Sequence, residues 1–268
     1  MNLEWPSKLD RLNLGSLGGG NHFIELQKSA DNKIWLMIHS GSRHLGQKVA
    51  KYYWRQAVKF SEKENIQLPN ADLAFLPADL EEGLNYIRDM NFALEYAQEN
   101  RKRMMAVFKD KISELLNGKV IFLQEVNIHH NYAALENHFG KDLWVHRKGA
   151  TSAKDGEIGI IPGSMGTPSY IVKGKGNLDS FQSCSHGAGR AMSRSKASKN
   201  LTVEECNKDM EGIVFDRWNK NKKCYRKDAE YDLSEAPQAY KNIESVIESE
   251  LDLIDPIVKL WPLAVLKG

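Results

Sequence analysis

The order of strand-like and helix-like segments constrains the fold of this 268-residue chain more than any other feature of its sequence. Residues 23–26 read as a strand with Phe23 and Glu25 on one face and Ile24 and Leu26 on the other, and the apolar run 34–38 predicts a second strand that pairs with the first as a hairpin. Apolar residues at helical spacing then predict one helix over 45–60 and another, with one possible break, from 79 to about 116. Because strands and helices do not alternate regularly, the pattern favours an α+β fold over a doubly wound sheet.

Shorter elements are expected in the second half of the chain. Residues 119–125 are strand-like, 127–137 are expected to return to helix, and the glycine-rich stretch 144–185 predicts short strands joined by tight loops. Further expected features are a capping box of Asp79 and Glu82 on the long helix, a second capping box of Thr202 and Glu205 on a short helix, a helix over 241–253 that stops before Pro256, and a strand over 263–266.

Composition places the chain among globular proteins, with 41% hydrophobic and 27% charged residues. The length allows one large domain or two small ones, and we expect a single domain over 1–268. No segment approaches the roughly 20 apolar residues of a membrane span, and the start lacks the apolar core of a secretory signal. Three cysteines do not form a disulfide framework and fit a reducing compartment, so we expect a cytoplasmic protein without membrane partners.

The net charge of +2 does not indicate a nucleic-acid partner, but basic residues gather in two places. Each cluster is either a solvated surface or a phosphate-binding surface. The first cluster contains Arg190, Arg194, Lys196 and Lys199, and the second contains Arg217, Lys220, Lys222, Lys223, Arg226 and Lys227.

Three histidines, His22, His39 and His130, each lie beside glycine or asparagine at the edge of an expected strand or helix. From such positions a side chain can point into a cleft, and neutral imidazole is a common metal ligand. Each histidine is either a hydrogen-bonded structural residue or a ligand, because the spacing matches no compact metal motif. Histidine ligands alone would favour zinc or iron over manganese.

Two glycine-rich loops, PGSMG at 162–166 and SHGAGR at 185–190, are either ordinary tight turns or phosphate-binding loops. A helix is expected after the second loop, and its N-terminus would favour an anion. His186 lies inside this loop near Arg190. A neutral imidazole is a competent nucleophile that can form a covalent intermediate, and a nearby cation would stabilise phosphoryl charge.

Seven motifs in order, from about Leu14 to Gly268, are together similar to the RtcB family of GTP-dependent RNA ligases. The motifs are GSLGGGNHFIE (15–25), HSGSRHLG (39–46), HHNY (129–132), RKGAT (147–151), IPGSMG (161–166), CSHGAGRAMSR (184–194) and LKG (266–268). The resemblance implies an RtcB-type mixed fold, with short strands and helices around a central metal and nucleotide cleft. It also implies a single catalytic domain that is truncated at its N-terminus relative to the family.

The resemblance implies a three-stage reaction centred on His186. This histidine would attack the α-phosphorus of GTP, release pyrophosphate and hold GMP through a phosphoramidate bond. An RNA end with a 2′,3′-cyclic phosphate would be opened to a 3′-phosphate, which accepts the GMP. A 5′-hydroxyl would then attack the activated end, seal the strand and expel GMP, as in RNA repair or tRNA splicing.

Site residues are carried over from the family only where this sequence matches its motifs. His22, His39 and His130 fall on the manganese-binding histidines, which hold two ions in a complete enzyme. Arg190 and Arg194 would lie near RNA phosphates. The guanylate-contacting positions are Asn21, His22, Phe23, Ile24, Glu25, His130, Asn131, Pro162, Gly163, Ser164, Met165, Ser169, His186, Gly187, Ala188, Gly189 and Lys267.

One departure from the family concerns the metal ligands. RtcB proteins carry an N-terminal Asp-x-Gly-Cys-Gly sequence whose Asp and Cys also bind manganese, and nothing similar occurs before Leu14. We therefore expect weaker metal binding, unless a separate chain supplies this segment. Cys184 is expected to be a buried structural thiol and not a substitute ligand. The alternatives to an active ligase are a truncated homologue that retains GMP or RNA binding and a histidine-metal phosphohydrolase.

Overall fold

The computed structural model describes residues 6–216, 218 and 231–268. The chain folds into two compact units, Met1–Gly18 with Ser40–Lys119 and Gly19–His39 with Val120–Gly268. The single domain over 1–268 stays a prediction. Helices and strands are both abundant and are not regularly alternated along the chain, which confirms the α+β class.

The first unit is helical. It contains α1 (Lys8–Asn13), α2 (Leu45–Lys63), the short 3₁₀ helix η1 (Ala71–Leu73) and α3 (Glu81–Leu115). Leu45 of α2 packs against Ala93 and Tyr96 of α3, as the helical spacing predicted. The helix α3 is continuous over 35 residues, so the possible break is absent from it.

Asn100 links α3 to the loop that follows α1 and to the loop that precedes α2. Its Oδ1 atom accepts hydrogen bonds from the backbone N–H groups of Gly15 and Ser16, at 2.7 and 3.1 Å. Its amide nitrogen donates to the Ser40 hydroxyl and the Gly41 carbonyl oxygen, both at 3.1 Å. A fully buried amide with several partners is a specific, directional constraint on this unit.

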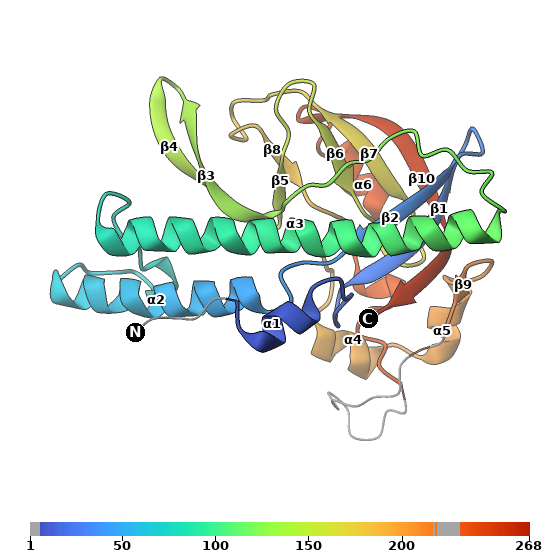
Figure 1. The fold of residues 1–268 in the computed structure, drawn as a ribbon, viewed down its shortest axis with the longest axis horizontal. Helices are drawn as coiled ribbons and strands as arrows, with labels where there is room; N and C mark the ends of the chain where they lie inside the picture. Colours follow the sequence, from blue (N-terminus) through green and yellow to red (C-terminus); the bar gives the residue numbers. More distant parts are fainter. Residues whose placement is uncertain (1–5, 217, 219–230) are drawn as a thin grey trace. The chain divides into compact units, whose positions relative to one another are not determined.

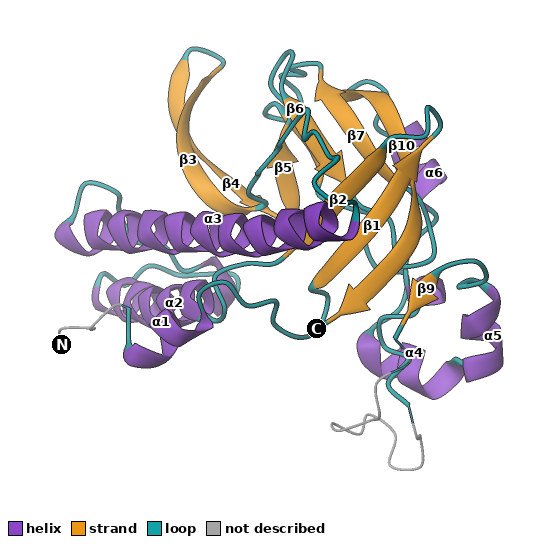
Figure 2. Ribbon diagram, turned by 45° about the vertical axis from the view of Figure 1, so that its right-hand side comes forward, coloured by secondary structure: helices purple, strands orange, loops and turns teal. Residues whose placement is uncertain are grey.

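The second unit contains a six-stranded sheet in which the order of the main path is β2-β1-β10-β7-β6, and β9 pairs with β10. Figures 1 and 2 show this sheet strongly curved, and α6 packs on it through Ile243 and Ile247. The strands of the sheet are β1 (Phe23–Ser29), β2 (Ile34–His39), β6 (Ile158–Ile161), β7 (Ser169–Gly174), β9 (Val214–Phe215) and β10 (Ile254–Lys267).

Two small ladders and several short helices complete the second unit. The strand β3 (Asn131–His138) pairs with β4 (Lys141–Lys148), and β5 (Ala150–Ser152) pairs with β8 (Ser183–Ser185). These short strands confirm the prediction for 144–185. The helices are α4 (Arg194–Asn200), α5 (Val203–Lys208), the 3₁₀ helix η2 (Pro237–Ala239) and α6 (Ile243–Glu248).

Several local predictions are confirmed and others are wrong. The hairpin of β1 and β2 and the capping box of Thr202 and Glu205 are present. The capping box at Asp79 is wrong, because α3 begins after Leu80 and has no side-chain cap. The strand over 119–125 is also wrong, because no partner strand pairs with this segment among the described residues.

The helix expected over 127–137 is a strand. Residues 131–138 form β3, and the turn to β4 uses Phe139 and Gly140, whose φ angles are 54° and 74°. Two positive φ angles match the right-handed twist of paired strands, so the turn favours a hairpin. Pairing with β4 thus decides the conformation of this segment.

The C-terminal strand is much longer than the expected 263–266. It contains Pro256 and Pro262. The register against β7 shifts directly after Pro256, and the register against β1 shifts beside Pro262. A proline lacks the N–H that a regular ladder uses, and a bulge removes that requirement. Pro256 therefore lies within the strand, and the preceding helix α6 ends earlier than expected, at Glu248.

Candidate functional site

Four histidines from distant parts of the chain form a row in the second unit. The ring centroids of His22 and His39 are 5.9 Å apart, those of His39 and His130 are 5.2 Å apart, and those of His130 and His186 are 4.9 Å apart. The three proposed metal ligands and the proposed nucleophile therefore lie side by side, although up to 164 positions separate them in the sequence.

Strand pairing explains how the first two histidines meet. Phe23 is opposite His39 in the register of β1 and β2, so His22 and His39 lie at the same end of this hairpin. The Phe23 ring meets His39 edge-on, with centroids 5.4 Å apart. The hairpin predicted from alternation therefore directly positions two of the candidate ligands.

The other two histidines meet across Gly149. Asn131 is opposite Lys148 in the β3–β4 ladder, and Ala150 is opposite Ser185 in the β5–β8 ladder. His130 and His186 each lie one residue beyond these pairs, so both flank Gly149. The N–H of Gly149 donates to the His130 carbonyl oxygen at 2.8 Å.

The Nδ1 atom of His186 lies 2.6 Å from the Gly149 carbonyl oxygen. A carbonyl oxygen only accepts hydrogen bonds, so Nδ1 must carry the proton and donate. In the neutral ring, Nε2 then carries the lone pair, which is the nucleophilic form of that atom. The fold therefore fixes which nitrogen of His186 is available for reaction.

His39 and His130 approach each other most closely, with their Nε2 atoms 3.2 Å apart. Asn131 accepts from the Gly149 N–H through Oδ1, so its amide nitrogen faces His130 Nδ1, at 2.9 Å. His130 Nδ1 consequently accepts, and His130 Nε2 donates to His39. Among residues 6–216, 218 and 231–268, no group of three or more His, Cys, Asp or Glu side chains is arranged to hold a metal ion.

Burial favours the neutral state of His39, one of the two inner histidines of the row. The pKa of His39 is held well below 6.5, first by burial and then by the neighbouring His130, His22, Lys267 and His186. Burial penalises the imidazolium, and nearby cations penalise it further. A neutral imidazole is the form that binds a metal ion.

The proposed guanylate-contacting side chains of β1 and β10 include a buried carboxyl group. Burial raises the pKa of Glu25 to about 8, although Lys267 and a hydrogen bond from Gln27 oppose the shift. Gln27 donates to Glu25 at 2.6 Å and to the Ser169 hydroxyl at 3.0 Å. The sequence interpretation missed Gln27, because a glutamine within a strand has no distinguishing motif.

Lys267 lies on the neighbouring strand, opposite Phe23. Its ammonium group is 5.6 Å from the centroid of the Phe23 ring and 3.7 Å from a carboxylate oxygen of Glu235. Burial lowers the pKa of Lys267, while Glu235 and Glu25 raise it. Lys267 and Glu25 are thus brought together by the pairing of β1 with β10.

The two glycine loops contact each other, but several of their N–H groups are already used. Ala188 N–H donates to the Pro162 carbonyl oxygen at 2.9 Å, and Gly163 N–H donates to the Ser169 hydroxyl at 3.2 Å. Ser164 N–H donates to the Thr167 hydroxyl at 2.7 Å. The helix expected at the second loop is displaced, because α4 begins at Arg194 with Ser193 as its N-cap.

The remaining guanylate-contacting candidates have mixed environments. Met165 belongs to a hydrophobic core with Cys206 and Val265, whereas Asn21 is exposed just before β1. Ile24 is half-buried on β1. Gly187 and Gly189 border Ala188, and a Cβ atom on Gly187 would be 3.1 Å from the Pro162 carbonyl oxygen. The structure therefore brings the two loops together through backbone contacts.

The two arginines proposed to contact RNA share one partner, Glu235. Arg190 donates to Glu235 at 3.2 Å and to the Ser234 carbonyl oxygen, and its guanidinium lies over the Tyr240 ring. Arg194 donates to Glu235 at 2.8 Å, and 42% of its side chain is exposed. The sequence interpretation missed Glu235 and Tyr240, since neither lies in a recognised motif.

The other basic residues and the cysteines add little to the site. Lys196 and Lys199 are exposed on α4, and the cluster from Arg217 to Lys227 lies outside the described residues. Cys184 is buried, as expected, and burial raises its pKa, so it is a poor candidate for a metal-binding thiolate.

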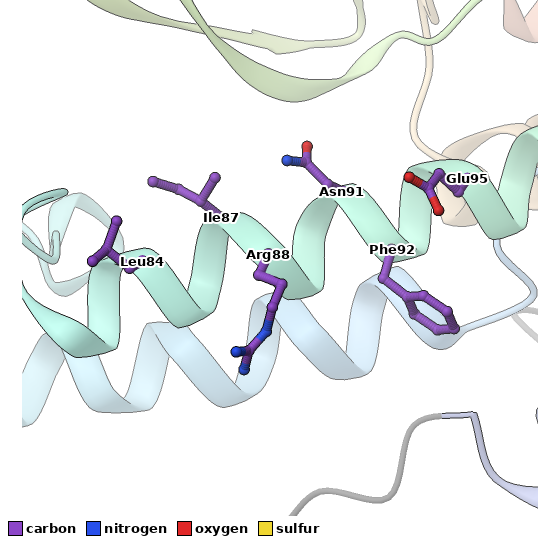
Figure 3. Close-up of a pocket in the computed structure, with 6 residues that line it drawn as sticks. All are labelled: Leu84, Ile87, Arg88, Asn91, Phe92 and Glu95. Atoms are coloured by element: carbon purple, nitrogen blue, oxygen red, sulfur yellow. The ribbon is translucent and has the colours of Figure 1, made fainter.

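An open hollow in the first unit offers no comparable chemistry. It runs along α3 and is lined by Leu84, Ile87, Arg88, Asn91, Phe92 and Glu95 (Figure 3). Its lining contains none of the four histidines. None of the described helices combines the length and apolar character needed to cross a bilayer.

Comparison with known proteins identifies the family of the chain. The family model "tRNA-splicing ligase RtcB" matches residues 6–268. The chain is 40% identical to the RNA-splicing ligase RtcB of Escherichia coli (strain K12) over 260 residues, which are 95% of this chain and 61% of that protein. It is 34% identical to the tRNA-splicing ligase RtcB of Methanococcus maripaludis over 300 residues, covering 95% of this chain and 60% of that protein.

The chain thus spans about three fifths of the length of these relatives. The match of the family model over almost all described residues, and the order of the seven motifs, lead to one conclusion. The chain belongs to the RtcB family of RNA-splicing ligases.

Proposed function

We propose that this chain carries the nucleotide-accepting site of a GTP-dependent RNA ligase, with His186 as the catalytic residue. One observation supports this role more than any other. The hydrogen bond from His186 Nδ1 to the Gly149 carbonyl oxygen leaves the Nε2 lone pair available to attack phosphorus.

The first step is attack of His186 Nε2 on the α-phosphorus of GTP. A phosphorus–nitrogen bond forms, the bond to the bridging oxygen breaks, and pyrophosphate leaves. The Nδ1 proton stays on the ring, where the Gly149 carbonyl stabilises the positive charge that develops on the imidazole. GMP is then held on His186 as a phosphoramidate.

The RNA steps use this activated nucleotide. A 2′,3′-cyclic phosphate is opened by water to a 3′-phosphate, and an oxygen of the 3′-phosphate displaces His186 from the GMP. The 5′-hydroxyl of the second strand attacks the activated 3′-phosphate, a new phosphodiester bond forms, and GMP leaves. The RNA partners are therefore ends with a 3′-phosphate or cyclic phosphate and ends with a 5′-hydroxyl.

Manganese is the metal proposed from the family, and His22, His39 and His130 would hold it. The Nε2 atoms of His39 and His130 are 3.2 Å apart, so these two rings could turn their lone pairs toward a common divalent ion. To use both Nε2 atoms, His130 must carry its proton on Nδ1 instead, and the Asn131 amide nitrogen that faces Nδ1 must turn away from it. A bound divalent ion would supply charge stabilisation for the phosphoryl oxygens.

Recognition of the nucleotide is assigned to β1, β10 and the two glycine loops. Glu25 and Lys267 present a buried carboxyl group and a half-buried amine from adjacent strands. Ser169 accepts hydrogen bonds from both Gln27 and Gly163, so its hydroxyl proton must point toward another acceptor. A guanylate placed along these residues would meet groups that are already oriented.

RNA contact is assigned to Arg194 and Arg190 beside the Glu235 carboxylate. The more exposed Arg194 is the better candidate for direct phosphate contact, because Arg190 makes several hydrogen bonds within the fold. Arg190 would then act by holding the surface on which Arg194 lies.

The test is incubation of the purified chain with manganese and α-labelled GTP. We expect an acid-labile label on the protein that is lost in His186→Ala and kept in His146→Ala, an exposed histidine of β4. If wild-type protein gains label only when the N-terminal segment of a related ligase is added, that segment supplies the Asp and Cys ligands. If it gains no label in either case, this chain is a binding homologue without ligase chemistry.

The hydrolase alternative has its own signature. A histidine-metal phosphohydrolase would release phosphate from a terminal phosphomonoester in the absence of GTP. A strict requirement for GTP would exclude it.

A further inference from the structure

We propose that Gly149 is a positioning residue that sets both the tautomer and the location of His186. This inference rests on the function proposed above, and it concerns a residue that lies between the motif histidines without touching substrate. Gly149 connects β4 to β5 and so belongs to the ends of two different ladders.

The two ladders meet at this one residue. Extending the β3–β4 register past Asn131 and Lys148 places His130 opposite Gly149. Extending the β5–β8 register past Ala150 and Ser185 places His186 opposite the same residue. A shift of either register by one residue would turn the side chains to the opposite face, so the ladders specify which histidines flank Gly149.

Both polar groups of the Gly149 backbone serve these neighbours. Its N–H donates to the His130 carbonyl oxygen at 2.8 Å and to Asn131 Oδ1 at 3.1 Å. Its carbonyl oxygen accepts from His186 Nδ1 at 2.6 Å. The backbone of Gly149 thus links His130, a proposed metal ligand, to His186, the proposed nucleophile.

Both backbone conformation and space favour glycine at this position. The φ angle of Gly149 is +68°, which side chains disfavour. A Cβ atom would lie 3.1 Å from His186 Cε1 and 3.3 Å from His186 Nδ1. A side chain would therefore press on the imidazole at the atoms next to the hydrogen bond that fixes its tautomer.

Gly149→Ala tests this role, and Gly140→Ala is its matched control. Gly140 has a similar φ of +74° in the β3–β4 turn, but nothing lies within 4 Å of the position of its Cβ atom. Both variants place a side chain at a similar positive φ angle, and only in Gly149→Ala does that side chain lie against His186. Misplacement of a reacting group by about 1 Å can cost roughly 100-fold in rate.

We expect Gly149→Ala to lower the rate of GMP attachment to His186 by about 10- to 100-fold, with little change in the GTP concentration for half-maximal rate. Gly140→Ala should stay within about threefold of wild type. An equal loss of rate in both variants would overturn the proposal, because strain alone would then explain the effect.

A second measurement uses unaltered protein, in case Gly149→Ala does not fold. Long-range proton–nitrogen NMR correlations identify which imidazole nitrogen carries the proton, and the His186→Ala spectrum assigns the resonance. At about pH 8.5, where imidazoles are neutral, we expect the His186 proton on Nδ1. A proton on Nε2 would overturn the inference.

The two measurements separate this inference from the proposed function. If wild-type protein gains no label from GTP but the His186 proton is on Nδ1, the proposed reaction fails and the positioning role stands. If label forms on a ring protonated at Nε2, the reaction stands and the positioning role fails.

Discussion

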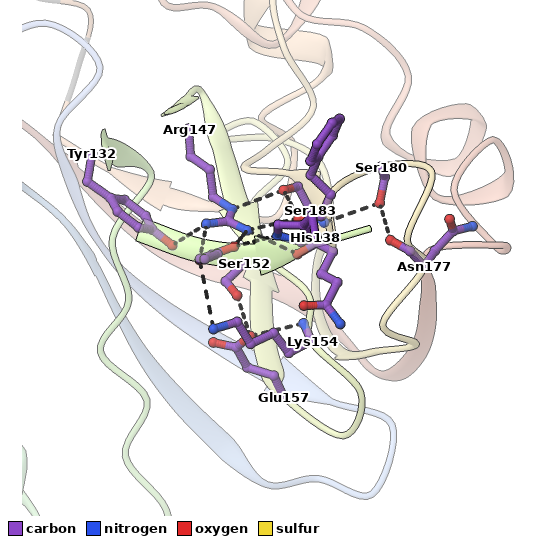
Figure 4. A network of polar contacts seen from close by, with 12 residues as sticks. Tyr132, His138, Arg147, Ser152, Lys154, Glu157, Asn177, Ser180 and Ser183 are labelled. Atoms are coloured by element: carbon purple, nitrogen blue, oxygen red, sulfur yellow. Dashed lines mark hydrogen bonds and ion pairs between the residues drawn. The ribbon is translucent and has the colours of Figure 1, made fainter. Parts of the chain in front are cut away.

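Arg147 donates from both of its terminal nitrogens to the carboxylate of Glu136, at 2.7 and 2.9 Å. The arginine is 1% exposed, and its Nε atom also donates to the Ser183 hydroxyl at 2.9 Å. Figure 4 shows Arg147 within this network, near Tyr132, His138 and Ser183. Arg147 and Glu136 therefore connect β3 and β4 to β8. These three strands adjoin His130, Gly149 and His186, respectively.

Removing the charge of Glu136 should destabilise the second unit. In Glu136→Gln, the buried Arg147 guanidinium loses its counter-charge, which costs about 3–5 kcal/mol of unfolding free energy. Urea unfolding would measure the loss. Glu114→Gln is the control, because Glu114 pairs with Lys111 on the exposed surface of α3 and should cost less than about 1 kcal/mol. A cost for Glu136→Gln as small as that of the control would contradict a structural role for the pair.

The same carboxylate predicts sensitivity to acid. Hydrogen bonds from Arg147 lower the pKa of Glu136 from 4.5 to about 2. The folded state therefore holds the charged form more tightly, and the stabilisation is present above about pH 4.5 and lost as pH falls through about 2. Urea midpoints measured between these limits should fall steeply in wild type and more gently in Glu136→Gln. Parallel pH profiles for the two proteins would show that the pair does not control acid unfolding.

Glu25→Gln should have the opposite dependence on pH. Burial raises the pKa of Glu25 to about 8, so the folded state keeps a proton that the unfolded chain releases above about pH 4.5. Stability is consequently lost as pH rises toward 8, and glutamine removes that loss. We expect a higher Tm for Glu25→Gln than for wild type at pH 8.5 and equal values at pH 4.5, together with slower attachment of GMP. Glu62→Gln, at an exposed site on α2, serves as the control. A Tm difference between Glu25→Gln and wild type that does not vary with pH would refute the raised pKa of Glu25.

Local patterns predicted the elements that depend on residues close in sequence. The β1–β2 hairpin and the capping box at Thr202 have their partners within a few positions, and both are present. Residues 131–138 were expected to be helical, yet they form a strand because β4 supplies a partner strand. The prolines of β10 are compatible with a long strand only because pairing slips beside them, which depends on the neighbouring strands.

The candidate site likewise combines residues that the sequence motifs predicted with contacts that depend on strand pairing. Motif resemblance selected four histidines, and the structure places them side by side, but the contact between His130 and His186 depends on two ladders. The role of Gly149 in those ladders follows from their registers, which the sequence does not specify. Glu235 was missed for a similar reason, since Arg190, Arg194 and Lys267 meet it only in the folded chain.

The two arginines beside Glu235 should separate into a binding role and a structural role. Arg194→Gln should weaken RNA binding and reduce the slope of log affinity against log salt by about 1, with little effect on Tm. Arg190→Gln should cost about 1.5–3 kcal/mol of stability, because it breaks hydrogen bonds to Glu235 and to the Ser234 carbonyl. RNA binding titrations at several salt concentrations, with Lys51→Gln on α2 as a comparison, would measure the first effect. An unchanged slope in Arg194→Gln would exclude it from the RNA surface.

Metal binding should depend on the closest histidine pair. His39→Ala and His130→Ala each remove one of two nitrogens that lie 3.2 Å apart. Loss of an outer-shell partner alone typically costs 10–100-fold in affinity, so loss of a ligand should cost at least about tenfold. Titration of manganese monitored by electron paramagnetic resonance would measure both variants against His146→Ala. Equal affinities in all three variants would place the metal elsewhere.

The central claim is that GMP is bonded to one particular atom, Nε2 of His186. Protein incubated with GTP and manganese would be digested under alkaline conditions, the modified residue located by tandem mass spectrometry, and the bonded nitrogen identified by proton–phosphorus NMR. The account predicts a phosphoramidate on Nε2 of residue 186, because the Gly149 carbonyl occupies the other nitrogen. GMP on Nδ1 of this ring, or on a different residue such as Lys267, would contradict it.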